Sequence, residues 1–396
     1  MKILFLAPFP CTLPVRANTV RLFHWLKYLS PRHDVTFVHF VDPGRNAVLP
    51  SDLCCRSVAV VRRKRTGLVP RAANLLSRRP YFLGEQFRSE EMFRTVEGIC
   101  REGAFDVVHC SSLAMAQYVP PASGRMKVLE GVDCNARNNL QQAGLQLGIR
   151  TRLLSWLDWR KLRRYEPEQY GRFDAGLLAS PQDRDFLLGL APRLPLHVLP
   201  SGVDLAYFSP QPGSAPSKGP EVVFVGPLDY APNRDAVGFF CSEVLPLILQ
   251  KRPETIFRVL GRVAGVKPVL RGAAAKNVLF SGHVPDMRPF LTAAGAVVCP
   301  LRMGTGIKNK VLEAMAMGKA LVMTPVAAEG VRASAERDYL CASSPRDIAE
   351  ALLKILSDPG LASGLGASAR KAVEAGHDWT ALAAGLESFY EKLLPV

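Results

Sequence analysis

Short apolar runs alternate with amphipathic segments along almost the whole chain, and this alternation limits the folds open to it. Fully buried parallel strands read as continuous apolar runs, and strand–helix alternation is typical of parallel sheets with helices on both faces. We therefore expect strands at 2–6, 35–40, 57–61, 105–109, 127–129, 175–179, 197–199, 222–225, 256–260, 278–280, 296–298, 320–323 and 339–342. Helices are expected between them, including 19–29, 85–101 and 150–170.

The length of 396 residues exceeds one usual hydrophobic core and predicts two domains. Proline, glycine and serine dominate residues 209–220, which is typical of an exposed linker. We expect an α/β fold with two doubly wound, Rossmann-like parallel sheets facing across a cleft, where ligands bind at the carboxyl ends of strands. The expected parts are a first domain at 1–204, a linker at 205–220, a second domain at 221–376 and a helix at 377–396 that packs back toward the first domain.

The opening sequence MKILFLAPFP has an apolar run that is short and ends in prolines. This favours a buried first strand over a signal peptide, and no run reaches the roughly 18 apolar residues of a spanning helix. The nine cysteines are scattered and form no CxxC pair. We therefore expect a cytoplasmic protein with free thiols and no zinc site.

The net charge of +15 is concentrated in the first half, at 62–65, 78–79 and 160–164. Such clusters fit a solvated basic face, a surface that docks on anionic lipid, or a nucleic-acid site. The nucleic-acid interpretation is the weakest, because no aromatic stacking motif or recognition helix accompanies the charge. We expect no nucleic-acid partner, and a location on the inner face of the cytoplasmic membrane remains open beside a purely cytoplasmic one.

Residues 302–318, with the sequence RMGTGIKNKVLEAMAMG, follow the apolar run 296–300. Gly304 and Gly306 stand just before an expected amphipathic helix. A glycine-rich turn that leads into a helix presents backbone N–H groups and the positive end of a dipole, which suits a phosphate.

Charged side chains accompany this turn. Lys308 and Lys310 add positive charge on the expected helix, and Arg302 can hold a phosphate with two donors. Glu313 lies further along the helix, where a carboxylate can accept hydrogen bonds from sugar hydroxyls. The stretch therefore predicts a site for a sugar attached to a diphosphate.

The segment VLEAMAMGKALVMT, at 311–324, resembles the donor-binding element of GT-B glycosyltransferases, specifically the retaining family 4. Further matches follow the same order along nearly the whole chain, at 199–204 (LPSGVD), 223–226 (VFVG), 259–262 (VLGR) and 280–286 (FSGHVPD). A narrower similarity is to the sugar transferases associated with exosortase and PEP-CTERM exopolysaccharide loci. It is carried by 114–118 (AMAQY), 172–180 (RFDAGLLAS) and 226–237 (GPLDYAPNRDAV).

The resemblance implies roles for particular residues, with the second domain binding the nucleotide sugar and the first facing the acceptor. It assigns Lys308, Arg302 and Asp133 to catalysis. It assigns donor binding to Gly226, Asn233, Arg262, Gly282, His283, Val284, Gly304, Thr305, Gly306, Ile307, Lys310 and Glu313. It assigns acceptor binding to Arg16, Asn18, Ser111 and Ser112.

The chain departs from the family pattern at two donor positions. Pro227 stands where many members carry arginine, so Arg302, Lys308 and Lys310 are expected to supply the missing charge. Thr305 stands eight residues before Glu313, where the family carries a second glutamate. In the first half, His109 is expected to be structural, and Glu166 follows Arg163 at a spacing that favours an ion pair on a helix.

We therefore expect a retaining, hexosyltransferase-type enzyme that moves a sugar from a nucleotide diphosphate to a glycan or lipid-linked acceptor in exopolysaccharide biosynthesis. No cofactor beyond the donor and no metal are expected, since Asp183 and Asp185 lie on a predicted helix rather than in a DxD loop. Three alternatives remain open: a sugar-nucleotide epimerase, a non-catalytic sugar-nucleotide-binding protein and a dinucleotide oxidoreductase. The last is the weakest, because no GxGxxG follows a strand.

Overall fold

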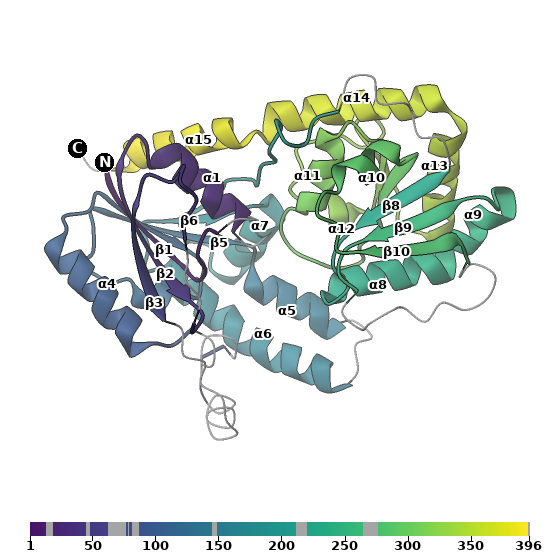
Figure 1. Cartoon of the computed structure of the whole chain (residues 1–396). Helices are drawn as coiled ribbons and strands as arrows, with labels where there is room; N and C mark the ends of the chain where they lie inside the picture. Colours follow the sequence, from purple (N-terminus) through teal and green to yellow (C-terminus); the bar gives the residue numbers. More distant parts are fainter. Residues whose placement is uncertain are drawn as a thin grey trace. The chain divides into compact units, whose positions relative to one another are not determined.

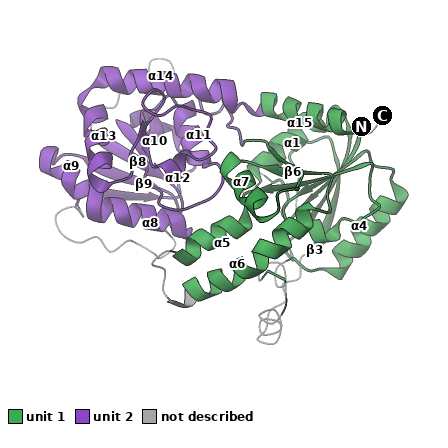
Figure 2. Ribbon diagram, turned by 180° about the vertical axis from the view of Figure 1, so that it is seen from behind, with its two compact units in different colours: residues 1–200, 380–396 green, residues 201–379 purple. Residues whose placement is uncertain are grey.

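A computed structural model describes residues 1–12, 19–44, 48–61, 77, 79–80, 87–144, 149–210, 220–263 and 276–394. The chain forms two compact units (Figure 2). Unit 1 is Met1–Pro200 with Thr380–Val396, and unit 2 is Ser201–Trp379. The boundaries between the two units therefore lie a few residues from 204 and 377, where the sequence predicted domain boundaries. Several expected features lie outside the described residues, namely Arg16, Asn18, the basic run 62–65, Arg78 and most of the linker.

Unit 1 is built on a seven-stranded parallel sheet in the order β3-β2-β1-β4-β5-β6-β7 (Figure 1). Every expected strand of the first half is present within a few residues. The central strands β1, β4 and β6 are almost fully buried, whereas the edge strands β3 and β7 are largely exposed or half-buried. The strands are β1 (Lys2–Ala7), β2 (Asp34–Val41), β3 (Arg56–Val61), β4 (Val107–Ser111), β5 (Met126–Val132), β6 (Ala175–Leu178) and β7 (Leu196–Val198).

The helices of unit 1 include the expected ones at 19–29 and 150–170. They are α1 (Val20–Leu29), α4 (Glu90–Glu102), α5 (Asn135–Gly144), α6 (Ile149–Tyr170), α7 (Pro181–Leu190) and α15 (Trp379–Leu393), with a short 3-10 turn at Ala116–Tyr118. The sequence signals their starts: α7 begins with proline, and the Ser180 hydroxyl before it accepts the backbone N–H of Asp183.

Glu166 does not pair with Arg163 along α6, so that expectation was wrong. Its buried carboxyl instead accepts the backbone N–H groups of Asn135 and Ala136, at 3.0 and 2.8 Å, and thereby caps the start of α5. Burial raises the pKa of Glu166 to about 7, although these hydrogen bonds oppose the shift. Tertiary packing of α6 against α5 decided this, since sequence spacing sees neighbours on one helix only.

Unit 2 contains a six-stranded parallel sheet in the order β10-β9-β8-β11-β12-β13. Its strands are β8 (Glu221–Val225), β9 (Ile256–Leu260), β10 (Val278–Gly282), β11 (Ala296–Cys299), β12 (Leu321–Met323) and β13 (Leu340–Cys341). Its helices are α8 (Ala231–Phe239), a π-helical turn (Phe240–Val244), α9 (Leu245–Lys251), α10 (Arg288–Ala293), α11 (Asn309–Ala316), α12 (Pro325–Ala328), α13 (Pro345–Ser357) and α14 (Pro359–Gly376). These elements confirm the α/β class predicted for both halves.

Strand order reverses once in each sheet. In unit 1, β1 and β4 are neighbours and the chain moves outward from them in opposite directions; in unit 2, β8 and β11 have the same relation. At such switch points the loops after the two central strands diverge and leave a crevice at the carboxyl edge, where ligands bind in open α/β sheets. The fold therefore directs attention to residues that follow β4 and those that follow β8 and β11.

Each unit has an apolar core of its own, as expected for separate domains. The last helix, α15, is anchored within unit 1. The His33 imidazole Nε2 lies 2.6 Å from Glu387 Oε1, and the Tyr390 hydroxyl lies 2.6 Å from His109 Nδ1. Across the described parts of the chain, none of the helices has the length and apolar character needed to cross a bilayer.

Gly261, after β9, provides a test of how tightly the carboxyl edge of unit 2 is packed. Its φ is +144°, and a Cβ there would lie 2.3 Å from the carbonyl oxygen of Gly226. We expect Gly261→Ala to destabilise the protein by about 1–3 kcal/mol, because backbone atoms have no room to yield. Gly238→Ala on α8 is the matched control, since its Cβ meets open space and alanine favours a helix by up to ~1 kcal/mol. Urea unfolding measures the free energy of unfolding of both variants. Equal values for the two variants would contradict the tight packing at Gly261.

Candidate functional site

Gly226 immediately follows β8 at the switch point of unit 2, and it allows two polar side chains to approach the backbone. Its φ is +156°, and a Cβ there would lie 2.6 Å from both Asn233 Nδ2 and Lys310 Nζ. Any other residue would displace one of these groups. The predicted requirement for glycine thus has a definite cause in the packing.

Asn233 and Lys310 form a hydrogen-bonded pair beside this glycine. Asn233 is buried in the first turn of α8, donates to the Pro227 carbonyl at 2.9 Å and accepts a hydrogen bond from Lys310 Nζ. The same ammonium lies 4.4 Å from the centroid of the Phe224 ring. Burial lowers the pKa of Lys310 to about 8, so a positive charge is held at the end of β8 at neutral pH.

Glu313 lies one turn after Lys310 on α11 and is half-buried. Burial raises the pKa of its carboxyl to about 7, and the charge of Lys310 opposes that shift. A cation and a carboxyl that titrates near neutrality therefore share one face of α11. When ionised, this carboxyl is a hydrogen-bond acceptor suited to paired hydroxyls.

The sequence had placed Lys308 on helix α11, but in the structure Lys308 is the residue that immediately precedes this helix. The lysine is buried, and its Nζ donates to the carbonyls of Gly304 at 3.2 Å and Gly306 at 2.8 Å. It also lies 3.9 Å from a carboxylate oxygen of Glu329, which follows α12. Lys308 thus holds the glycine turn in shape, and Glu329 is a charged neighbour that no motif had indicated.

Two predicted arginines are engaged by acids at the surface. Arg302 Nε donates to Asp235 at 2.9 Å, and its guanidinium carbon lies 4.8 Å from the Phe239 ring centroid. Arg262 forms an ion pair with Asp229 at 2.6 Å. Both arginines are exposed and charge-balanced, so Lys308 and Lys310 are the more deeply placed cations among the predicted site residues.

The remaining predicted donor residues lie on the loops after β10 and β11. Gly282 ends β10 with a φ of +70°, His283 is exposed, and Val284 packs against the core of unit 2. Thr305 and Ile307 are half-buried in the turn after β11. The two loops leave the same carboxyl edge of the sheet because all the strands are parallel.

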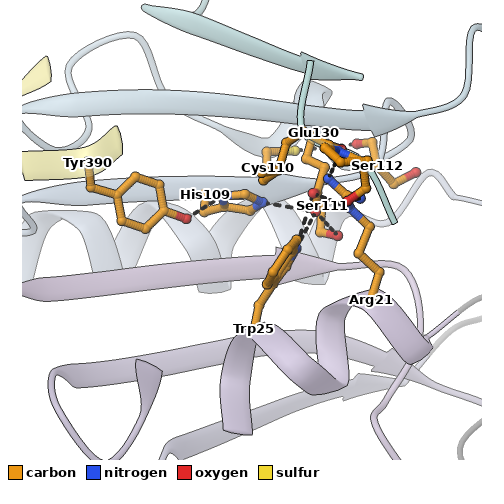
Figure 3. A network of polar contacts seen from close by, with 10 residues as sticks. Arg21, Trp25, His109, Cys110, Ser111, Ser112, Glu130 and Tyr390 are labelled. Carbon is orange, nitrogen blue, oxygen red and sulfur yellow. Dashed lines mark hydrogen bonds and ion pairs between the residues drawn. The ribbon is translucent and has the colours of Figure 1, made fainter. Parts of the chain in front are cut away.

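Unit 1 contains a buried polar network centred on Glu130 of β5 (Figure 3). Its carboxylate accepts hydrogen bonds from Arg21 and from the Trp25 indole at 3.1 Å, both on α1. On β4, the Ser111 hydroxyl donates to it at 3.3 Å and His109 Nε2 lies 3.2 Å away. Burial alone would raise the pKa of Glu130, but the charge of Arg21 and the contacts with His109 hold it well below its usual range.

The network explains why His109 is structural, as the sequence suggested. Its ring is buried between Glu130 and the Tyr390 hydroxyl, so both ring nitrogens have protein partners. Arg21 also donates to the carbonyls of Leu199 and Pro200, at 2.7 and 2.8 Å. A charged residue inside the apolar run of β5 was the signal that could have revealed this network from the sequence.

Three predicted residues gather at the carboxyl edge of the unit 1 sheet. Ser111 ends β4 and Ser112 follows it, Asp133 follows β5, and the two strands are adjacent and parallel. The backbone is strained there, because Ser112 has a φ of +143° and the β-branched Val132 a φ of +64°. Such strain in non-glycine residues concentrates at functional sites.

Acidic and thiol side chains form no metal-binding group of three or more in the part of the chain that the structure describes. Asp183 and Asp185 do lie on a helix, α7, as the sequence predicted. Asp183 is buried and paired with Arg137 at 3.1 Å, so this carboxylate is committed to an ion pair.

The comparisons with known proteins agree with this arrangement. Residues 219–358, all in unit 2, match the family profile described as glycosyl transferases group 1. No curated protein sequence matches the chain significantly. The matched range contains every predicted donor residue.

Solved structures share the fold of the entire chain at low identity. Sucrose-phosphate synthase from Thermosynechococcus elongatus is 16% identical with a TM-score of 0.73, and 99% of each chain is covered. HepE of Anabaena in complex with UDP and glucose is 12% identical with a TM-score of 0.67, again with 99% of each chain covered. A TarM variant of S. aureus is 11% identical with a TM-score of 0.70, covering 98% of this chain and 100% of the other.

These findings show a similarity to glycosyl transferases of group 1 within residues 219–358 and a shared fold over the whole chain. The family match lies on the unit that carries the glycine turn and its lysines. The structural likeness extends the fold to both units.

The shifted pKa of Glu313 predicts a pH dependence of stability. Between 4.5 and about 7, the unfolded chain releases this proton while the folded chain keeps it, so the free energy of unfolding falls as pH rises. Glu313→Gln removes that contribution. As pH rises from 4.5 to about 7, we expect the melting temperature of the variant to increase relative to that of the wild type. If the melting temperatures of the two proteins change with pH in the same way, the pKa of the Glu313 carboxyl is not raised by folding.

Proposed function

We propose that the chain is a retaining glycosyltransferase that moves a hexose from a nucleotide diphosphate to a hydroxyl of a glycan or lipid-linked acceptor. The observation that carries the proposal is the pair Lys308 and Lys310 at the switch point of unit 2, within the range that matches group 1. We place the activity in exopolysaccharide biosynthesis, on the motifs shared with exosortase-associated, family 4 transferases. The location that fits is the cytoplasm or the inner membrane surface.

The donor diphosphate binds beside Gly226 in this proposal. The absence of a side chain there lets phosphate oxygens approach the backbone, and Lys310 supplies a partly desolvated charge. The start of α11 faces the negative charge that develops on the leaving diphosphate. Lys308 joins it by exchanging the Gly304 and Gly306 carbonyls for phosphate oxygens. Electrostatic stabilisation of such charge is usually the largest single contribution to catalysis, and here it needs no metal ion.

The rest of the donor contacts the neighbouring loops. The ionised Glu313 accepts hydrogen bonds from ribose hydroxyls, and the backbone at Gly282 to Val284 passes the base. Thr305 replaces a glutamate, so the hydroxyl of Thr305 and the turn around it contact the sugar ring. Arg302 and Arg262 would need to exchange their aspartate partners for phosphate to take part.

Uridine nucleotides are the first donors to test. The solved structures of HepE hold UDP, UDP with glucose, or UDP-glucose, and an E. coli protein of the same fold is bound with UDP-2-fluoro glucose. These ligands belong to those proteins. Their shared chemistry is a uridine diphosphate, whose negative charge fits the charges at Lys308 and Lys310.

The acceptor side lies at the carboxyl edge of the unit 1 sheet in this proposal. Ser111 and Ser112 offer hydroxyls, and the half-buried Asp133 is the carboxylate that accepts the acceptor's proton. Glu130 is unsuited to that role, because it is fully buried and held ionised by Arg21. It positions β4 and β5 instead. Retention then follows the family pattern of attack on the face that the diphosphate leaves.

One observation favours a second candidate. Thr305 and Pro227 remove a carboxylate and a cation that the family pattern contains, which suits a protein that binds a nucleotide sugar without transferring it. Turnover separates the two, since a binding protein raises its melting point with donor but releases no nucleotide.

Lys308→Ala tests the catalytic assignment. We expect kcat for sugar transfer to fall by about 10²–10³-fold, because a positive charge beside the leaving group is lost. Lys371→Ala, an exposed lysine on α14, is the matched control and should leave turnover unchanged. Melting curves show whether both variants fold, and a folded Lys308 variant with wild-type turnover would remove this role.

Asp133→Asn tests the acceptor side separately. The substitution keeps the size of the side chain but removes its capacity to take a proton, so we expect kcat to fall about 10²-fold or more. The affinity for the donor, measured by thermal shift with a UDP-sugar, should not change. A loss of donor affinity with intact kcat would place Asp133 outside the chemistry.

A further inference from the structure

Helices α5 and α6 of unit 1 pack against each other and form a helical hairpin (Figures 1 and 2). This hairpin exposes an unusual group of large apolar side chains. Leu153, Leu154 and Trp156 on α6 are 54%, 47% and 41% exposed, and Leu140 on α5 is 38% exposed. Leu140 lies four residues before the end of α5 and Leu153 four residues after the start of α6, and these two helices pack against each other. Single exposed leucines need no explanation, but a contiguous group of them marks an interaction surface.

Arginines continue the same face of α6. Leu153, Trp156 and Arg160 follow one another at helical spacing, and Arg163 and Arg164 come one turn later. All three arginines are exposed. The Arg160 guanidinium carbon lies 5.0 Å from the Trp156 ring centroid. The stripe from Leu153 to Arg164 is about 17 Å long at 1.5 Å per residue.

Acidic groups are few along this stripe. Asp158 is half-buried on the flank of the helix, and Glu166 is buried beneath it, where it caps α5. Glu168 is exposed but lies one turn beyond Arg164, at the far end. The outward face therefore combines an apolar patch with a purely cationic one over three helical turns.

An anionic lipid surface matches this combination. Leucine and tryptophan side chains partition into the boundary between headgroups and acyl chains, and arginines beside them pair with phosphates. A nucleic acid would satisfy the arginines but offers no apolar phase for the leucines. We propose that the α5–α6 hairpin docks on an anionic phospholipid membrane, with Leu153, Leu154 and Trp156 inserted and Arg160, Arg163 and Arg164 at the headgroups.

The docking is interfacial and independent of the proposed transfer reaction, so it can be measured without any donor or acceptor. The full-length protein is sedimented with vesicles of phosphatidylcholine alone or mixed with phosphatidylglycerol. We expect binding to the mixed vesicles and little to the neutral ones. Each arginine contributes about fivefold near such a surface, so Arg160→Gln with Arg164→Gln should weaken partitioning about 25-fold.

The apolar contribution is separated by salt and by matched controls. Concentrated salt screens the charge of the arginines, so the vesicle binding that the wild type keeps at high salt comes from its apolar side chains. This residual binding should be lost in the double variant Leu153→Gln, Leu154→Gln. Leu393→Gln at the end of α15 and Arg32→Gln after α1 change other exposed side chains of unit 1. These controls should bind like the wild type, and all variants should keep its melting temperature because the altered side chains are exposed.

Tryptophan fluorescence reports insertion directly. Of the four tryptophans, Trp25 and Trp379 are buried, Trp159 is half-buried and Trp156 is exposed. Mixed vesicles should shift the emission to shorter wavelength in the wild type. Trp156→Phe should still bind but show no such shift.

Several results would overturn the proposal. One is equal binding of the wild type to neutral and mixed vesicles. Another is undiminished binding by both the double arginine variant and the double leucine variant, which would assign the membrane contact to other basic segments. Vesicle binding without a fluorescence shift would exclude insertion. A dimer that dissociates in the Leu153→Gln, Leu154→Gln variant, with no vesicle binding, would make this face a contact between two copies of the chain.

Discussion

Parallel pairing throughout both sheets is the constraint on which the position of every site residue depends. When all strands of a sheet point the same way, their carboxyl ends meet at one edge, and a reversal of strand order opens that edge between two central strands. Gly226 and the turn at Gly304 meet in unit 2 because β8 and β11 are neighbours. Ser111 and Asp133 meet in unit 1 because β4 and β5 are neighbours.

Buried ionisable groups have different partners at the carboxyl edges of the two sheets. In unit 1, Glu130 has a cation and several donors, so it remains ionised and holds β5, β4 and α1 together. In unit 2, burial moves Lys310 and Glu313 toward their neutral forms, because their protein partners compensate less than burial costs. Such partly compensated groups are typical of ligand sites, where a substrate completes the pairing. The contrast fits the structural role of Glu130 and supports the binding role proposed for Lys310 and Glu313.

The sequence predicted the strands and the glycine turn because both depend on local pattern. Continuous apolar runs marked all the strands, and two glycines before VLEAMAMG marked the start of α11. The sequence missed contacts between distant segments: Glu329 beside Lys308, Asp235 on Arg302, and Glu166 beneath α5. It also placed Lys308 inside the helix, since helical spacing does not reveal where the first turn begins.

The amino-acid sequence by itself determined the two α/β domains, the position of the glycine turn before α11 and the charged residues around it, since periodicity, glycine and charge act over a few neighbouring residues. Tertiary structure decided which of those residues carry shifted pKa values and which are bound by acids. It also decided that the exposed face of α6 joins leucines to arginines. Burial and pairing depend on segments far apart in the chain, and only the packed sheets and helices bring those segments together.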